Sequence, residues 1–183
     1  MLTRRFLSGF SVFDLMIVAI LAALGIAVSG IVGYLVRIVT SMLFIPGGAV
    51  AGGIYMLFLV LAVAFTKKKS AALLCGFVQA IIVMVTGFGG HHGAMTIITY
   101  TMPGVAVLVL LLIMRRDCSC RLSCFFSCLA ANMMGTFLVA AGVMGLPMVP
   151  MLLAITVSAL SGGLGGLLAF SLVQQVEKTG VLH

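Results

Sequence analysis

Two adjacent histidines, His91 and His92, stand in a glycine-rich stretch at residues 87–93 (GFGGHHG). Imidazole is the commonest metal ligand among side chains, and glycines let the backbone approach a bound molecule closely. Arg37 adds a guanidinium, which pairs well with a carboxylate. These residue types suit a large ligand that carries a metal and an acidic group, with His91 and His92 as its metal ligands. A solvated turn and a surface arginine explain the same residues, and both interpretations stay open.

Gln79 and Asn132 are amides near the middle of long apolar runs. An amide is costly in an apolar environment unless it is hydrogen-bonded. We therefore expect each amide to bond a neighbouring helix or to contact a substrate from the floor of a pocket. Together with two tyrosines, the candidate substrate-binding residues are His91, His92, Arg37, Tyr55, Gln79, Tyr100 and Asn132.

Four of the five cysteines cluster at residues 118–128. Cys120, Cys124 and Cys128 have the spacing i, i+4, i+8 and share one face of a helix. Such a face can bind a soft metal or carry an acyl chain, and it can equally consist of small apolar residues.

The elements that carry all these residues are membrane spans. Of the 183 residues, 63% are hydrophobic and 7% are charged, which excludes a soluble globule. A transmembrane helix needs roughly 20 apolar residues, and six such runs occur, at about residues 12–36, 47–66, 70–88, 94–114, 122–143 and 150–173. We expect an all-α membrane protein, a single domain over residues 1–183 that forms a bundle of six transmembrane helices.

The cations orient this bundle. The formal net charge is +7, and nine of the ten cations fall in the segments on one side of the alternating spans: Arg4, Arg5, Lys67, Lys68, Lys69, Arg115, Arg116, Arg121 and Lys178. Arg37 alone falls on the other side. By the positive-inside rule both termini are cytoplasmic. We therefore expect a multi-pass protein of the bacterial cytoplasmic membrane, with no nucleic-acid partner. The cysteines then face a reducing compartment, so structural disulfides are not expected.

The three acids, Asp14, Asp117 and Glu177, all fall at the predicted cytoplasmic ends of helices. No carboxylate is therefore embedded in the membrane for coupling to protons or sodium, and no phosphate-binding loop is present for ATP. The chain is expected to be neither an enzyme nor a holder of an intrinsic cofactor. If it moves a solute uphill, a partner supplies the energy. Ser11 and Asp14 have the spacing of a helix-start capping box.

Three predicted helices carry small residues at a spacing of four, which lets helices pack closely in a membrane. The sets are Ala19, Ala23 and Ala27; Gly48 and Gly52; and Ser158, Gly162 and Gly166. Packing within the bundle explains two such sets. The alanine stripe is a candidate docking face for another membrane subunit.

The six spans, the Ala19-x3-Ala23-x3-Ala27 stripe and the absence of an ATPase motif resemble the S-component of an energy-coupling factor (ECF) type ABC importer. Three segments resemble its hydroxymethylpyrimidine/thiamin permease subfamily: residues 65–74 (FTKKKSAALL), 161–168 (SGGLGGLL) and 178–182 (KTGVL). The resemblance implies that the chain binds a vitamin or cofactor at the outer face, beneath a lid of outer loops. It also implies docking through Ala19, Ala23 and Ala27 to a transmembrane T-component, with two cytoplasmic ATPases driving the complex.

The substrate is argued from the missing acids. Members of that subfamily carry glutamates in their second and third helices, where this chain has Tyr55 and Gln79. A desolvated cation without a counter-charge costs several kcal/mol. We therefore favour haem, or another tetrapyrrole such as cobalamin, over thiamin or its hydroxymethylpyrimidine precursor. A stand-alone channel or facilitator is the alternative from another class.

Overall fold

The computed structural model describes residues 9–40, 47–88, 93–118 and 120–179. Within these ranges the chain forms six α-helices and no strand. They are α2 (Val12–Thr40), α3 (Gly47–Thr66), α4 (Ala71–Thr86), α5 (Thr96–Met114), α6 (Arg121–Phe137) and α7 (Met148–Lys178). A short 3-10 helix, η2 (Gly93–Met95), precedes α5, and a π-helix, η3 (Leu138–Val143), continues α6.

The predicted six helices are confirmed, and the differences lie at their ends. The prediction that the third helix reaches residue 88 is wrong, because Gly87 takes a left-handed conformation (φ 67°) and its N–H caps the Val83 carbonyl. The last helix runs from Met148 to Lys178, several residues longer than predicted. Its last turns hold Gln174, Gln175 and Glu177, which are good helix formers although they are not apolar.

Five of these helical segments are long and apolar enough to cross a membrane. The exception is α4, whose 16 residues rise about 24 Å, against roughly 30 Å of hydrocarbon. The chain is therefore an all-helical, multi-pass membrane protein. That α4 also spans the bilayer stays a prediction, as does the cytoplasmic position of both termini.

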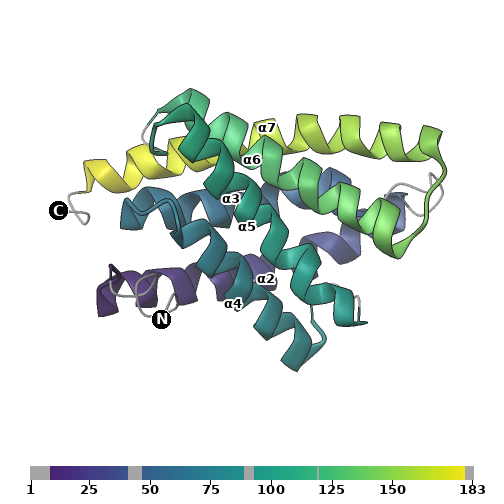
Figure 1. Ribbon diagram of the computed structural model, residues 1–183, viewed down its shortest axis with the longest axis horizontal. Coiled ribbons are helices and arrows are strands. Elements are labelled where there is room, and N and C mark those ends of the chain that lie inside the picture. Colours follow the sequence, from purple (N-terminus) through teal and green to yellow (C-terminus); the bar gives the residue numbers. More distant parts are fainter. Residues whose placement is uncertain (1–8, 41–46, 89–92, 119, 180–183) are drawn as a thin grey trace.

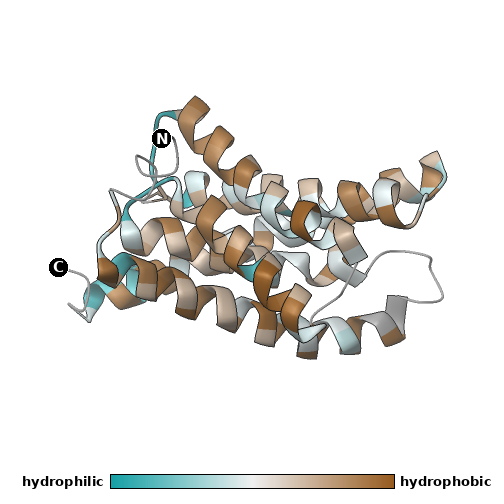
Figure 2. Cartoon of the chain, turned by 60° about the horizontal axis from the view of Figure 1, so that its bottom comes forward, coloured by the Kyte–Doolittle hydropathy of each residue, from teal (hydrophilic) through white to brown (hydrophobic). Residues whose placement is uncertain are grey.

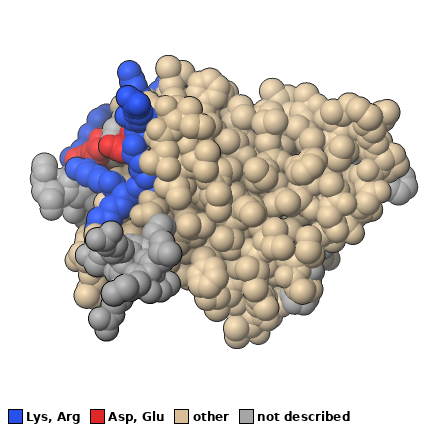
Figure 3. Space-filling model, viewed as in Figure 1, with Lys and Arg blue, Asp and Glu red and all other residues tan. Residues whose placement is uncertain are grey.

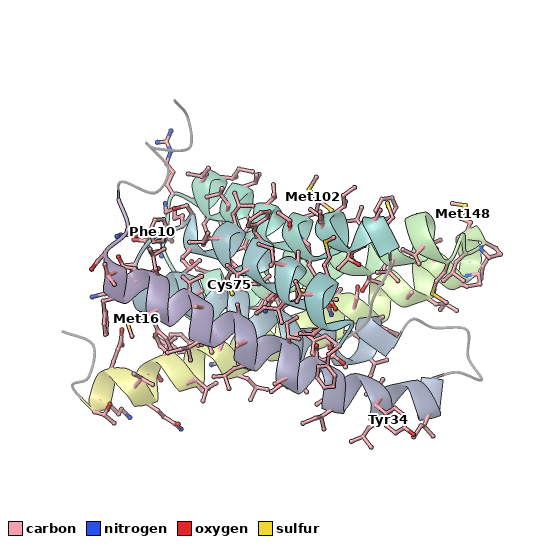
Figure 4. All side chains as sticks on the ribbon, turned by 90° about the horizontal axis from the view of Figure 1, so that it is seen from below. Phe10, Met16, Tyr34, Cys75, Met102 and Met148 are labelled. Atoms are coloured by element: carbon pink, nitrogen blue, oxygen red, sulfur yellow. The ribbon has the colours of Figure 1, made fainter. Side chains whose placement is uncertain are left out.

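Helix α3 is the centre of the bundle, because it packs against all five other α-helices. Figure 1 shows α2 and α7 running along the long axis of the molecule and α4 and α5 crossing it obliquely, with the start of α2 and the end of α7 at the same end. Large apolar side chains face outward, including Val85, Ile113 and Leu160, which are 81%, 76% and 70% exposed. In Figure 2 these hydrophobic residues appear brown along the helices. In Figure 4, Tyr34 points away from the bundle, whereas Cys75 lies inside it. Such a surface suits lipid.

Charged side chains gather at one end of the molecule, here called the charged end, as Figure 3 shows on one face. There Lys68 Nζ lies 2.6 Å from Asp14 Oδ2 and 4.9 Å from the centre of the Phe10 ring. The capping box is confirmed, since the Ser11 N–H donates to Asp14 Oδ2 (2.8 Å) and Ser11 Oγ accepts from the Phe13 N–H (3.3 Å). The Lys68–Asp14 ion pair fixes the start of α2 to the loop between α3 and α4.

Helices α3 and α7 touch backbone to backbone. A Cβ added to Gly165 would lie 2.0 Å from the Gly53 carbonyl oxygen, and one added to Gly53 would lie 1.9 Å from the Ser161 carbonyl oxygen. Neither carbonyl can move aside as a flexible side chain would. The glycines are therefore required by the closeness of the two helices and not by their own backbone angles.

We predict that Gly165→Ala prevents normal folding, because the added methyl group displaces α3 from α7. The yield of monodisperse protein in detergent and its thermal unfolding measure the effect. The matched control is Leu164→Ala, which shortens a 64% exposed neighbour and should leave both readouts near wild type. Normal yield and stability for Gly165→Ala would contradict the observed helix contact.

Candidate functional site

Asn132 is a buried junction between three helices. It lies on α6 with 1% of its surface exposed. Its Nδ2 donates to the Ala49 carbonyl of α3 (3.3 Å) and to the Ser158 carbonyl of α7 (2.8 Å). Among the described residues its Oδ1 has no hydrogen-bond partner, and it lies where a side chain of Gly52 would begin. Of the two roles predicted for this amide, the interhelical one is confirmed by these contacts.

Ser161 makes a second bond across the same junction, and the sequence analysis missed it. Its Oγ accepts from the Gly53 N–H (3.1 Å) and donates to the Val50 carbonyl. Cys128 Sγ adds a longer contact to the Gly53 carbonyl (3.6 Å). We call Asn132 and Ser161, with the Ser158 carbonyl and the α3 backbone groups that they bond, the polar seam. In the sequence, Ser161 stands directly before Gly162 and Gly163, and this pattern could have indicated a close crossing of two helices.

Gln79 lies between α4 and its neighbours α2 and α3. It is buried on α4, and its Nε2 lies 2.4 Å from where a Cβ of Gly25 would stand on α2, close to Phe58 of α3. The missing side chain at Gly25 thus makes room for the amide. Since Asn132 contacts α3 and α7, the two predicted amides face different neighbours.

The two predicted tyrosines are half-buried. The Tyr55 hydroxyl on α3 lies 3.0 Å from the position of a Gly33 Cβ on α2. Tyr100 lies on α5, where its carbonyl faces Gly76 of α4. The described contacts therefore place both residues between helices, and they do not bring them together with Asn132.

His91, His92 and the side chain of Arg37 lie outside the described residues. The residues that flank the histidines are described. Before them, the Phe88 ring fills the space over Gly30 of α2, and after them the Met95 methyl lies 3.2 Å from the position of a Gly142 Cβ on η3. Phe88 and Met95 thus contact α2 and the π-helix η3, respectively.

The cysteines separate by environment. Cys75, Cys118, Cys124 and Cys128 are buried, and Cys120 is half-exposed. Cys124 Sγ donates to the Cys118 carbonyl (3.4 Å). Within the ranges that the structure describes, no three His, Cys, Asp or Glu side chains are grouped to hold a metal ion. The buried thiols are thus packed as small core residues.

The three stripes of small residues differ in exposure. Gly52 faces Asn132, while Gly162 and Gly166 lie against the backbone of α6, so these stripes pack within the bundle. Ala19, Ala23 and Ala27 are all exposed, and their neighbour Ala22 is fully buried. The alanine stripe therefore faces outward from α2.

Comparison with protein families assigns the chain. The family model described as "ABC-type cobalt transport system, permease component" matches residues 13–134, more than half of the chain. The chain belongs to this family. The matched region covers α2 to α5 and most of α6, including the alanine stripe and Asn132. No curated protein sequence matches it significantly.

A solved structure described as "Crystal structure of an S-component of ECF transporter" has the same fold. It aligns with a TM-score of 0.79 at 20% sequence identity, over 94% of this chain and 88% of that chain. The S-component fold that the sequence resemblance implied is thus confirmed for this member of the cobalt permease family. The subfamily and the substrate are separate questions.

We predict that Asn132→Asp destabilises the protein without any ligand present. The isosteric change places a carboxylate oxygen against the two carbonyls that Nδ2 now serves, at a cost of about 1–3 kcal/mol. Thermal unfolding in detergent measures it. The control is Gln174→Glu, the same chemical change at an exposed position of α7. If Asn132→Asp unfolds like wild type, the polar seam is not structural.

Proposed function

We propose that this protein is the substrate-binding S-component of an ECF-type importer. In this role it captures a vitamin or cofactor at the outward end of the bundle, opposite the charged end. A transmembrane T-component and two cytoplasmic ATPases supply the energy. The membership in a family of transport permeases and the S-component fold support this proposal.

The observation that carries the proposal is the exposed alanine stripe on α2. Gly52 and the stripe of Ser158, Gly162 and Gly166 are buried between helices of the bundle, but Ala19, Ala23 and Ala27 face outward. Small side chains let two helix backbones approach closely where no hydrophobic effect drives association. The stripe therefore suits a helix of the T-component. The Lys68–Asp14 pair fixes the start of the same helix (2.6 Å).

The favoured substrate is haem or another metal-bearing tetrapyrrole. All three acids of the chain lie toward the charged end, so a bare cation would meet no carboxylate at the other end. The family description names cobalt transport, and a corrinoid such as cobalamin carries cobalt with its ligands already in place. His91 and His92 would then supply axial ligands, and Arg37 would pair with an acidic group of the macrocycle.

The alternative substrate is thiamin or its hydroxymethylpyrimidine precursor. The buried amides Gln79 and Asn132 favour it, because an amide donates and accepts as the edge of an aminopyrimidine does. Tyr55 and Tyr100 would offer aromatic faces for the ring. Against it, Asn132 Nδ2 is already bonded to two helix carbonyls.

Copurification with partners tests the role of the alanine stripe. We predict that Ala23→Leu keeps the protein folded but abolishes recovery of a T-component and ATPases, because the larger side chain separates the helices. Ala141→Leu makes the same change at another exposed alanine and should retain the partners. Ala22→Leu, at a fully buried position, should lower stability instead. If Ala23→Leu assembles normally, or wild type recovers no partners and conducts solute alone, the S-component role on this surface fails.

Absorption spectroscopy tests the substrate. We predict that purified protein shifts and sharpens the Soret band of haem on titration and that the His91→Ala/His92→Ala double variant leaves the band as in free haem. His183→Ala is the control and should bind like wild type. Titrations with cobalamin, free Co²⁺ and hydroxymethylpyrimidine run in parallel. Binding of hydroxymethylpyrimidine with none of haem or cobalamin would replace the tetrapyrrole by the alternative substrate.

A further inference from the structure

A group of exposed cations lies at the charged end, directly after α3, directly after α5 and at the first residue of α6. We call it the basic patch; its members are Lys67, Arg115, Arg116 and Arg121. Lys69 donates to the Leu111 carbonyl near the end of α5 (3.3 Å), so the loop after α3 lies against the end of α5. The proposed transport role uses none of the four cations, and the site is independent of that role.

The acids of the charged end are engaged by other side chains or lie elsewhere. Asp14 pairs with Lys68 (2.6 Å), and Asp117 pairs with Lys69 (3.7 Å). The third acid, Glu177, is exposed in the last turn of α7. Within the ranges that the structure describes, no ion pair neutralises a cation of the basic patch. The patch therefore presents uncompensated positive charge, and Figure 3 shows basic side chains gathered at this end.

Two members of the basic patch stand where the backbone favours glycine. Among the described residues, positive φ angles occur at Gly87, Gly93 and Gly145, and also at Lys67 (φ 54°) and Arg115 (φ 51°). The left-handed conformation costs energy for a residue with a Cβ and almost none for glycine. The turns away from the charged end thus use glycine, whereas the turns after α3 and α5 use a cation.

The helix dipole does not account for these two cations. A cation near the C-terminus of a helix is favourable, but α3 and α5 have no basic residue in their last turns, where ordinary helical backbone would carry one. Lys67 and Arg115 instead lie just past the helices, in the costly conformation. A strained backbone that local structure does not require indicates a role for the side chain itself.

Exposed apolar side chains border the basic patch. Leu112 and Ile113, at the end of α5, are 56% and 76% exposed, and Leu122, which follows Arg121, is 64% exposed. The helices that carry them are long and apolar enough to cross a membrane, so these side chains suit acyl chains. Guanidinium groups bind phosphate oxygens through paired hydrogen bonds. A molecule that fits both surfaces has an anionic phosphate headgroup and apolar chains.

We propose that the basic patch binds the headgroup of an anionic phospholipid of the surrounding bilayer. The arginines bond the phosphate oxygens, Lys67 adds positive charge, and the acyl chains lie along Leu112 and Ile113. Each cation near an anionic membrane surface adds to the attraction, and salt screens it. The lipid ties the loops after α3 and α5 to the membrane surface.

Native mass spectrometry of the full-length protein, released from a neutral detergent, tests this site. The probes are phosphatidylglycerol and phosphatidylcholine with the same acyl chains, and glycerol phosphate as a headgroup without chains. We expect phosphatidylglycerol to bind several-fold more tightly than phosphatidylcholine and glycerol phosphate to compete poorly. Raising the ammonium acetate concentration should weaken the binding of phosphatidylglycerol and leave that of phosphatidylcholine nearly unchanged.

Arg115→Gly separates lipid binding from folding. Glycine suits the left-handed backbone, so the variant should unfold at or above the wild-type temperature while its affinity for phosphatidylglycerol falls by about five-fold. Lys67→Gly should behave in the same way. The matched control is Lys178→Gln, which removes a cation from the end of α7 and should bind phosphatidylglycerol like wild type.

Equal binding of the two lipids, or wild-type affinity for phosphatidylglycerol in Arg115→Gly, overturns the proposal. If Arg115→Gly keeps the lipid and loses copurifying proteins instead, the basic patch belongs to a protein partner. Glycerol phosphate that competes as well as the lipid would make the patch a site for soluble anions, which also overturns it. So does an Arg115→Gly variant less stable than wild type, because the arginine would then serve the fold.

Discussion

The polar seam is the constraint on which the rest of the bundle depends. Hydrocarbon offers no water to buried polar groups, so helices that meet there must satisfy one another. Asn132 and Ser161 do this by bonding the α3 backbone from α6 and α7. The contact is possible because Gly53 and Gly165 have no side chains between the helices. Because α3 packs against every other α-helix, its position sets the positions of the others.

The sequence was sufficient to predict the helices and the segregation of charge, because both follow from local composition. It could not say where each buried amide points. Gln79 and Asn132 stand at similar depth in apolar runs, yet one fills the space over Gly25 and the other joins α3 to α7. Those partners are set by which helices are adjacent, and this follows from contacts far apart in the chain.

The alanine stripe and the helix ends also depend partly on local sequence and partly on contacts between helices. Spacing identified three small-residue stripes but not which of them the bundle would bury, and exposure of Ala23 beside buried Ala22 depends on where α3 and α4 pack on α2. The π-helix after Phe137 was not predicted from the sequence. The histidine segment lies outside the described residues, so its role rests on residue types and on its anchored flanks.

The described charged side chains gather at one end of the molecule, and the proposed ligand site lies at the other. In the proposed role the protein is a passive binding subunit. Solute uptake into proteoliposomes tests this claim most directly. We expect no accumulation by this chain alone and ATP-dependent accumulation once a T-component and ATPases are added. Accumulation or rapid equilibration of solute by the chain alone would contradict it.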